Sequence, residues 1–344
     1  MSGTEKIPQG TAALPTSIDV ARRAGVSQAA VSLVFGGKAE GRVGRRTREA
    51  ILRAAEELGY RPNRVARTLR SGRSRLVILA VPDVSNPYFA AVLQGAEQAA
   101  RRDDYAILLA GVRDEHDWQH VVLDALTSHA VDGCLLYADL PGMAQTSTLL
   151  RGKTVLVDRS HPVLATLQLD VRAGVQAAMN HLFALGHTRV AHLGAAIEQE
   201  TFQLRHAAYR AAMQAASLAV PDVYEERAAF LLEDACAAAY RLLTRVEAPS
   251  AVLCDSDMLA VGVYKAAHKL GRRIPEDLSV VGFDDSLVAS ILEPELTTVA
   301  IPTTRIGEEA FLLLRSLLEG RPVPTPVLMP LELVIRASTA VIFS

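Results

Sequence analysis

The stretch TSIDVARRAGVSQAAVSLVFGG, residues 16–37, decides the fold of the amino-terminal part of the chain. Thr16 can cap the first amides of a helix, and Asp19 suits the positive end of that helix. Gly25 supplies the backbone conformation of a sharp turn, after which Ser27 caps a second helix. Two short helices joined by a glycine turn predict a helix-turn-helix, the unit that places its second helix in a major groove of DNA.

The second helix has two different faces. Val31 and Val34 are spaced to pack inward. The opposite face carries four side chains that would reach base edges or phosphates: Gln28, Ala29, Ser32 and Leu33. Gln28 can pair with adenine, whereas Ala29 and Leu33 offer only apolar contact, for example to a thymine methyl group.

A third helix is expected over about residues 45–58, and a segment of another kind follows at residues 60–73. There Asn63 can cap a very short helix that Gly72 ends, and a helix of fewer than about ten residues is not stable alone in water. The short helix and its end carry arginines at 64, 67, 70 and 73 for phosphates, and one exposed apolar side chain is expected, Leu69. We therefore predict a hinge helix that folds on DNA, pairs with a second copy and inserts an apolar wedge into the minor groove. A solvated basic linker is the alternative.

The distribution of charge agrees with a DNA-binding head. The chain as a whole has a net charge of −2, but residues 1–75 hold 15 Lys and Arg against 6 Asp and Glu. The remaining residues hold 21 basic and 32 acidic side chains. Because the local field matters more than the total charge, the head alone is expected to meet a polyanion.

Length and cysteine usage limit the remaining possibilities. A chain of 344 residues suits two or three domains, and it contains no apolar run long enough to span a membrane. The first fifteen residues lack the hydrophobic stretch of a secretory signal and are expected to form a flexible tail. The three cysteines, Cys134, Cys236 and Cys254, are scattered, which favours a reducing cytoplasm over disulfides or zinc. We predict no metal and no cofactor.

Residues 16–73 resemble the DNA-binding and hinge region of the lac repressor (LacI/GalR) family, through IDVARRAGVSQAAVS and TREAILRAAEELGYRPNRVARTLRSG. The likeness continues in order through most of the chain. It is carried by VPDVSNPYFAAVLQGAE (81–97), VDG (131–133), VLVDR (155–159), LGHTRVAHLG (185–194), DMLAVG (257–262), IPEDLSVVGFDDS (274–286) and ELTTVAIP (295–302).

Together with the faces described above, the resemblance implies a set of DNA-binding side chains. These are Thr16, Ser27, Gln28, Ala29, Ser32, Leu33, Thr47, Tyr60, Asn63, Arg64, Ala66, Arg67 and Leu69. The chain departs from the family at Leu33, where many members have a polar or charged residue, and at Ala30, where many have threonine. A serine that often caps the third helix is replaced by Gly44, with Thr47 nearby. These departures leave the operator sequence open.

From residue 75 onward, short apolar runs alternate with segments of helical length, which predicts parallel sheets covered on both faces. The expected strands are 76–81, 106–110, 133–137, 154–157, 190–193, 251–254 and 279–283, with a last one at 332–337. The expected helices include 89–101, 173–185, 204–216, 235–245, 258–270 and 305–318. About 270 residues suffice for two such sheets, which resembles the two-lobed periplasmic-binding-protein-like fold that the family uses.

The predicted organisation has four parts. A flexible tail covers 1–15, an all-α helix-turn-helix domain 16–62, a hinge helix or linker 63–74, and an α/β effector-binding and dimerisation domain 75–344. We expect one lobe of this last domain to comprise about 75–165 and 300–324. The second lobe would comprise about 166–299 and 325–344.

Polar residues that follow predicted strands are the candidates for a ligand site, because ligands of parallel sheets bind at the carboxyl ends of the strands. The resemblance implies a cleft between the lobes with Asn86, Tyr88, Phe89 and Asp158 on one side and Arg205, Phe230, Ser256 and Asp284 on the other. Charged groups that bind hydroxyls, together with an aromatic ring, fit a sugar or sugar derivative. Ser256 stands where the family usually has asparagine, so a nucleobase or another small metabolite stays open.

We therefore predict a cytoplasmic, homodimeric, sequence-specific transcription regulator, a repressor, that binds a palindromic operator under control of a small molecule. The sequence does not decide whether this effector releases or promotes DNA binding. One alternative is a solute-binding receptor of a transport system, which would need an export signal and no basic head. A DNA-binding protein with a non-functional cleft is a second alternative. An enzyme with a fused regulatory head is a third, but no nucleophile elbow, P-loop or metal-binding helix pair is found.

Overall fold

The computed structural model describes residues 15–37, 39–61, 72–112, 118–138 and 150–342. The chain divides into two compact units, Met1–Ser74 and Arg75–Ser344. This division falls where the sequence analysis placed the start of the effector-binding domain. None of the helices in the described ranges is long and apolar enough to cross a membrane.

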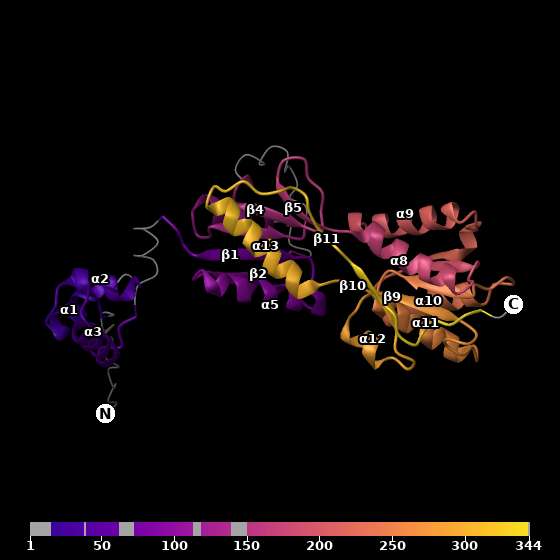
Figure 1. Ribbon diagram of the computed structural model, residues 1–344, viewed down its shortest axis with the longest axis horizontal. Coiled ribbons are helices and arrows are strands. Elements are labelled where there is room, and N and C mark those ends of the chain that lie inside the picture. The colour runs from indigo at the N-terminus through magenta and orange to yellow at the C-terminus, as the bar shows by residue number, and fades with distance from the viewer. Residues whose placement is uncertain (1–14, 38, 62–71, 113–117, 139–149, 343–344) are drawn as a thin grey trace, which may run out of the picture. The chain divides into compact units, whose positions relative to one another are not determined.

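In its described residues the first unit contains three helices, α1 (Ser17–Ala24), α2 (Gln28–Phe35) and α3 (Arg45–Glu57) (Figure 1). Thr16 and Asp19 form a reciprocal capping box at the start of α1, and Gly25 ends this helix with φ of 67°, in the left-handed region. The three helices enclose one small core, made by Val20, Ala21, Val31, Ile51, Ala54 and Ala55. The caps and the inward face thus match the prediction for a helix-turn-helix. Gly44 precedes α3 and provides no side-chain cap.

The second unit is built on two six-stranded sheets. The first has the strand order β11-β5-β4-β3-β1-β2 and comprises β1 (Leu76–Val81), β2 (Ala106–Gly111), β3 (Gly133–Leu136), β4 (Thr154–Val157), β5 (Ala165–Leu169) and β11 (Val327–Met329). The second has the order β12-β10-β9-β8-β6-β7 and comprises β6 (Val190–Ala195), β7 (Glu225–Ala228), β8 (Ala251–Cys254), β9 (Ser279–Asp284), β10 (Thr297–Ala300) and β12 (Glu332–Val334). All pairs are parallel except β10 with β12.

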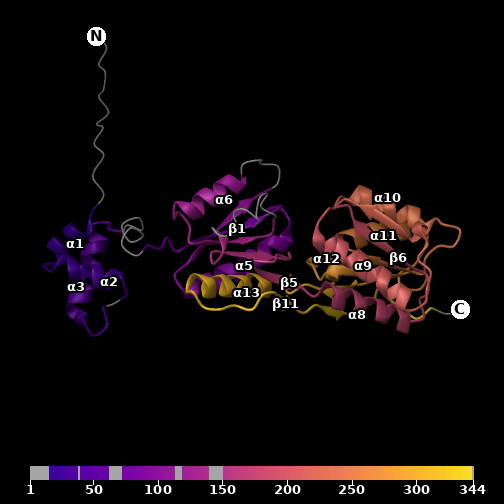
Figure 2. The ribbon, with the colours of Figure 1, turned by 90° about the horizontal axis from the view of Figure 1, so that it is seen from above.

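Helices cover both faces of each sheet. Around the first sheet lie α5 (Pro87–Arg102), α6 (Trp118–Thr127) and α13 (Thr303–Leu318), and Figure 2 shows α6 on the opposite face from α5 and α13. Around the second lie α8 (Val171–Ala184), α9 (Glu200–Ala215), α10 (Leu232–Leu243), α11 (Asp257–Lys269) and the short α12 (Leu287–Ile291), with a 3-10 turn at Asp222–Tyr224. Along β1, Leu79 packs with the core under α5 and α13 while Ile78 packs with the core under α6. This alternation is what a strand buried on both faces requires.

The lobe boundaries drawn from the sequence need correction. We refer to the first sheet with α5, α6 and α13 as lobe 1, and to the second sheet with α8 to α12 as lobe 2. β5 and β11 belong to the first sheet, where Val327 pairs with Leu167, so lobe 1 extends beyond residues 165 and 324. Both are short strands directly before a crossing to the other sheet, and the sequence pattern does not show to which sheet such a strand adds.

Helices α5 and α13 approach each other closely through two glycines. A Cβ atom on Gly95 would lie 1.8 Å from the carbonyl oxygen of Thr304, and one on Gly307 would lie 1.9 Å from that of Val92. Such distances are far inside van der Waals contact, so any side chain here forces the helices apart. This contact fixes α5, whose first turn carries residues of the candidate site.

We expect Gly307→Ala to lower the free energy of unfolding by about 1–3 kcal/mol, because a methyl group placed against a backbone carbonyl overpacks the helix contact. Urea unfolding followed by circular dichroism measures this loss. Gln94→Ala, on the exposed side of α5, is the matched control and should change stability little. Equal stability of Gly307→Ala and the wild type would show that the two helices can separate freely.

Candidate DNA-reading surface and effector site

The predicted reading face of α2 is accessible in part. Gln28 and Ala29 are exposed, while Ser32 and Leu33 are half-buried. The Gln28 side-chain amide donates to Ser17 Oγ over 3.0 Å, which holds it near the start of α1. An exposed glutamine and alanine at the start of a helix-turn-helix second helix are placed as base contacts require.

Two of the predicted contact residues already have structural roles. Thr16 Oγ1 donates to the Asp19 carboxylate over 2.7 Å, and Ser27 Oγ accepts from the amide of Ala30 over 3.3 Å. Each hydroxyl therefore caps a helix. The Thr16 hydroxyl gives its one proton to Asp19, whereas the Ser27 hydroxyl only accepts in this contact and keeps its proton for a phosphate oxygen.

Tyr60 and Thr47 lie at the edge of the small core. The Tyr60 ring packs edge-on against Phe35, with ring centroids 5.5 Å apart, and both are half-buried. Thr47 lies in the first turn of α3 and is also half-buried. The predicted hinge contacts lie outside the described residues: Asn63, Arg64, Ala66, Arg67 and Leu69.

In the second unit, polar and aromatic side chains gather where strands end. Tyr137 directly follows β3, Asp158 directly follows β4, and Asp284 is the last residue of β9. Tyr88 lies in the first turn of α5, and α9 contributes two residues from its amino-terminal half. We call this group the effector cluster: Tyr88, Tyr137, Asp158, Thr201, Arg205 and Asp284. It contains residues of both lobes.

Arg205 is the central cation of the effector cluster. Its side chain is 4% exposed, and one terminal nitrogen (Nη1) donates to the main-chain carbonyl of Asp255. The guanidinium carbon lies 3.7 Å from the centroid of the Phe283 ring and 5.0 Å from that of Phe202. A cation held over aromatic faces and bound to a carbonyl is well fixed, although neither partner neutralises its charge.

Two carboxyl groups lie near this cation, and burial acts against the charged form of both. Burial raises the pKa of Asp158 to about 6, although Arg205 acts to lower it. Burial also raises the pKa of Asp284 well above its ordinary value, again against Arg205. Both residues adopt positive φ, 57° for Asp158 and 117° for Asp284, in a region that non-glycine residues rarely occupy. Such local strain is concentrated at functional sites.

Several buried polar atoms of the effector cluster have no hydrogen bond of good geometry. Within the described residues these are Tyr137 Oη, which lies near Tyr88, Thr201 Oγ1, which lies near the Asp158 carboxyl group, and Arg205 Nε; the one further atom of this kind is Arg315 Nε. Since buried polar groups are normally paired, such atoms call for an explanation. Three of them in one cluster, including donors and acceptors, are what a polar ligand would satisfy.

Aromatic rings border the effector cluster. Tyr88, Phe89 and Tyr137 contact one another edge to face, with centroids 5.0 to 6.0 Å apart. In lobe 2, Phe202 and Phe230 contact edge to face at 5.8 Å. Next to them, Glu200 at the start of α9 accepts from the amide and hydroxyl of Ser160 over 3.0 and 2.6 Å. Since Ser160 follows β4, this contact joins the lobes beside the cluster.

The effector cluster differs in part from the predicted set. Tyr88, Asp158, Arg205 and Asp284 are brought together, with Phe89 packed beside Tyr88. Asn86 and Ser256 instead cap α5 and α11, where their side-chain oxygens accept from backbone amides over 3.0 and 3.2 Å. Tyr137 and Thr201 were missed, although Tyr137 ends a predicted strand and that position was a usable signal.

Other polar residues of lobe 2 have structural partners. Asp257 accepts from Thr298 and Ser286, and Asp285 pairs with Arg336 over 2.6 Å. His187 contacts the hydroxyls of Ser250 and Ser279 in the interior. The described residues contain no group of three His, Cys, Asp or Glu side chains that could hold a metal ion.

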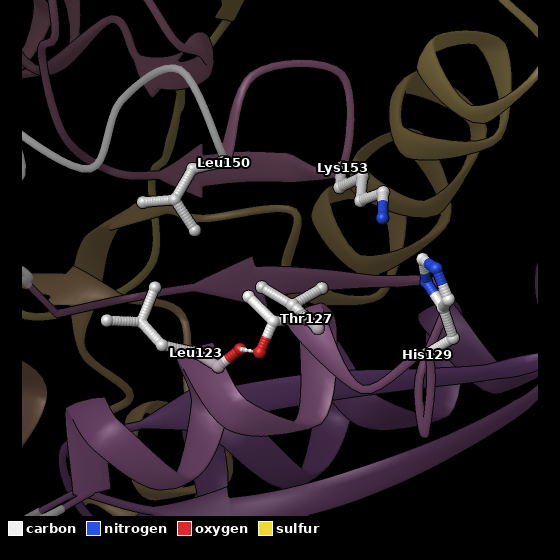
Figure 3. A pocket seen from close by; sticks show the side chains of 6 residues that line it. Leu123, Thr127, His129, Leu150 and Lys153 are labelled. Carbon is white, nitrogen blue, oxygen red and sulfur yellow. Dashed lines mark hydrogen bonds between the residues drawn. The ribbon is translucent and has the colours of Figure 1, made fainter.

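A separate hollow of about 260 Å³ lies elsewhere in lobe 1 (Figure 3). It is lined by Leu123, Leu126, Thr127, His129, Leu150 and Lys153. His129 and Lys153 precede β3 and β4, so this hollow is at the amino ends of the strands. The effector cluster lies at the opposite, carboxyl ends, where ligands of parallel sheets bind.

Comparison with known proteins agrees with this architecture. Residues 18–63 match the family model described as bacterial regulatory proteins, lacI family, and residues 179–339 match a periplasmic binding protein-like domain. The chain is 32% identical over 336 residues to the HTH-type transcriptional repressor CytR of Escherichia coli K12, covering 96% of this chain and 97% of that protein. It is 36% identical over 341 residues to the HTH-type transcriptional regulator MalR of Streptomyces coelicolor, covering 94% and 96%.

Two solved structures show the same combination of units. The lac repressor dimer bound to operator and the anti-inducer ONPF has a TM-score of 0.85 at 25% identity, covering 95% of this chain and 99% of that one. A complex of the transcriptional regulator CelR with cellobiose has a TM-score of 0.70 at 30% identity, covering 94% and 99%.

A helix-turn-helix unit followed by a two-lobed α/β domain with parallel sheets defines a DNA-binding transcription regulator. The chain belongs to the lacI family of bacterial regulatory proteins.

The raised pKa of Asp158 has a consequence for stability. A carboxyl group whose pKa is higher in the folded state favours folding when it is protonated, so its contribution declines as the pH rises from about 4 to 6. We expect Asp158→Asn to stabilise the ligand-free protein at pH 7 by about 1–2 kcal/mol, a figure reduced for partial exposure. It should also flatten the pH dependence between pH 4 and 6. Urea unfolding at pH 4.5, 6.0 and 7.5 measures both effects, and identical profiles for the two proteins would contradict the burial of this charge.

Proposed function

We propose that this regulator is a cytoplasmic homodimeric repressor whose affinity for a palindromic operator is set by a small polyhydroxylated molecule, a sugar or sugar derivative, bound at the effector cluster. The observation that carries the proposal is Arg205, buried near the carboxyl groups of Asp158 and Asp284 with its Nε unpaired among the described residues. We further propose that the chain has no enzymatic activity.

The chemistry of the effector cluster favours a neutral ligand rich in hydroxyls. Carboxylates at Asp158 and Asp284 would accept hydrogen bonds from hydroxyl groups, and Arg205 would donate to a ring or hydroxyl oxygen. The edge-to-face aromatic rings supply apolar surface for the carbon skeleton. Among similar proteins, one solved structure contains cellobiose, another lacI family regulator contains bound ribose, and one relative is a ribose operon repressor.

Exposed apolar side chains support a dimer. Leu108 and Leu109 are 46% and 40% exposed on β2, the edge strand of the first sheet, and Leu287 and Ile291 are exposed on α12. An unpaired edge strand with exposed leucines needs a cover, and a second copy of the chain would provide it. A closed dimer also matches the two-fold symmetry of a palindromic site.

Effector and DNA are expected to influence each other reciprocally, with a coupling of ~1–3 kcal/mol. The sign of this coupling decides whether the ligand induces or co-represses. Genome-wide capture of bound DNA, followed by operator titrations with and without candidate sugars, would identify both partners. A well-folded dimer that binds no duplex specifically would overturn the proposed function.

Arg205→Ala should leave operator binding within about twofold and abolish the change in operator affinity caused by the effector, because it removes the only cation of the effector cluster. Thermal shift and operator titration with ribose and cellobiose as the first probes measure the response. Arg189→Ala, which removes an exposed arginine of lobe 2, is the control. A retained effector response in Arg205→Ala would remove this residue from the site.

DNA affinity should fall steeply with salt, because each neutralised phosphate releases a counterion. We expect the plot of log affinity against log salt to have a slope steeper than about −4 for the dimer, measured by fluorescence anisotropy on an operator fragment. A shallow slope in the wild type would contradict binding through the basic amino-terminal unit.

Gln28→Ala should reduce the preference for operator over random DNA and leave the salt slope unchanged, since this side chain reads a base.

A further inference from the structure

A buried histidine and aspartate lie behind the effector cluster, and neither belongs to it. His192 is in β6 and Asp255 directly follows β8, and each side chain is 3% exposed. His192 Nε2 and Asp255 Oδ1 are 2.9 Å apart, and Asp255 Oδ2 accepts from the amide of Ala195 over 2.9 Å. Both carboxylate oxygens are therefore occupied, and the pair ties the end of β6 to the end of β8.

The same aspartate holds Arg205 through its main chain. The carbonyl oxygen of Asp255 accepts from the Arg205 guanidinium, which also stacks on Phe283. Burial alone would raise the pKa of the Asp255 side chain, but His192 and Arg205 together lower it below its usual value. The carboxylate is thus ionised, and its two hydrogen bonds fix the residue whose carbonyl holds Arg205.

The histidine ring is itself held in place. It is stacked on Tyr209, with centroids 5.0 Å apart and planes inclined by 21°, and on His206, at 5.6 Å and 17°. Gly194 lies close to the pair, since a Cβ there would be 3.2 Å from His192 Cε1 and 3.4 Å from Asp255 Oδ2. A ring with this packing has one orientation available, and that orientation directs Nε2 to Asp255.

We propose that His192 and Asp255 are positioning residues of the effector site, which fix the carbonyl that holds Arg205 and thereby preorganise its guanidinium for the ligand. This inference rests on the proposed effector role of Arg205. A group that is already ordered loses less freedom when the ligand binds, so the pair raises effector affinity without touching the effector.

The test uses the full-length dimer and a signal of Arg205 itself. In the wild type, the Nε–Hε resonance of Arg205, assigned by its absence in Arg205→Lys, should be displaced by the ring current of Phe283. In His192→Leu, which removes the donor to Asp255, this resonance should move toward the position of exposed arginines. In His192→Gln, whose amide nitrogen can replace Nε2, it should return. The matched control is His187→Leu, which removes another buried histidine of lobe 2, bonded to Ser250 and Ser279, and should leave Arg205 unchanged.

Effector affinity gives the second measurement. For whichever of ribose and cellobiose binds the wild type, we expect His192→Leu to weaken binding about tenfold and His192→Gln to restore most of it, with operator affinity unchanged. An unmoved Arg205 resonance in folded His192→Leu would overturn the positioning role, and so would an undisplaced resonance in the wild type, which needs no variant to fold. If neither sugar binds, the resonance still decides this inference, while the proposed sugar effector fails separately.

Discussion

Arg205 carries a full positive charge into the interior of lobe 2, where 4% of its surface is exposed. Removing a charge from water is costly unless fixed partners replace the water. Here the partners are the Phe283 ring, the carbonyl of Asp255 and the carboxyl groups of Asp158 and Asp284. These partners come from three segments of the chain, since Asp158 follows β4, Asp255 follows β8, and Phe283 and Asp284 end β9.

The parallel sheets provide that arrangement. Strands of a parallel sheet end at one edge, so the residues that follow β3 and β4 meet in lobe 1, and Asp284 ends β9 at the carboxyl edge of the second sheet. Asp158 and Asp284 adopt left-handed backbone conformations, and three buried polar atoms of the effector cluster lack hydrogen bonds of good geometry among the described residues. A fold selected for stability alone would avoid both features. Strained backbone and unpaired polar atoms are instead typical of a site that binds a polar molecule and releases it.

The amino-terminal unit is organised by a different principle. Its core is small, and the helices owe their bounds to local signals, such as the capping box of Thr16 and Asp19 and the left-handed Gly25. A basic unit of this size suits contact with a polyanion, whereas the net negative charge of the receptor domain disfavours contact with DNA. The amino-terminal unit is therefore suited to DNA and the receptor domain to a small ligand. A coupling free energy between the two binding sites is what would link them.

Local signals in the sequence determined much of this protein. They gave the helix-turn-helix almost to the residue, since α2 begins directly after its predicted cap Ser27 and α3 ends one residue short of the predicted Leu58. They also gave most strands of both sheets, because fully buried parallel strands are continuous apolar runs. Resemblance to the family pointed to Tyr88, Asp158, Arg205 and Asp284. β5, β7, β10 and β11 were not predicted, because each is only three to five residues long and lies at a sheet edge or a crossing between sheets.

Only the tertiary structure decided which side chains meet. It showed that Ser256 and Asn86 cap helices, that Tyr137 and Thr201 join the effector cluster, and that His192 reaches Asp255. The meeting of Thr201 with the effector cluster and of His192 with Asp255 has no sequence signature, since these contacts join residues that are close in space but distant in the chain. Capping and turn formation depend on near neighbours and can be read from order alone. Pairing across a sheet depends on strand order and register, which the whole fold sets.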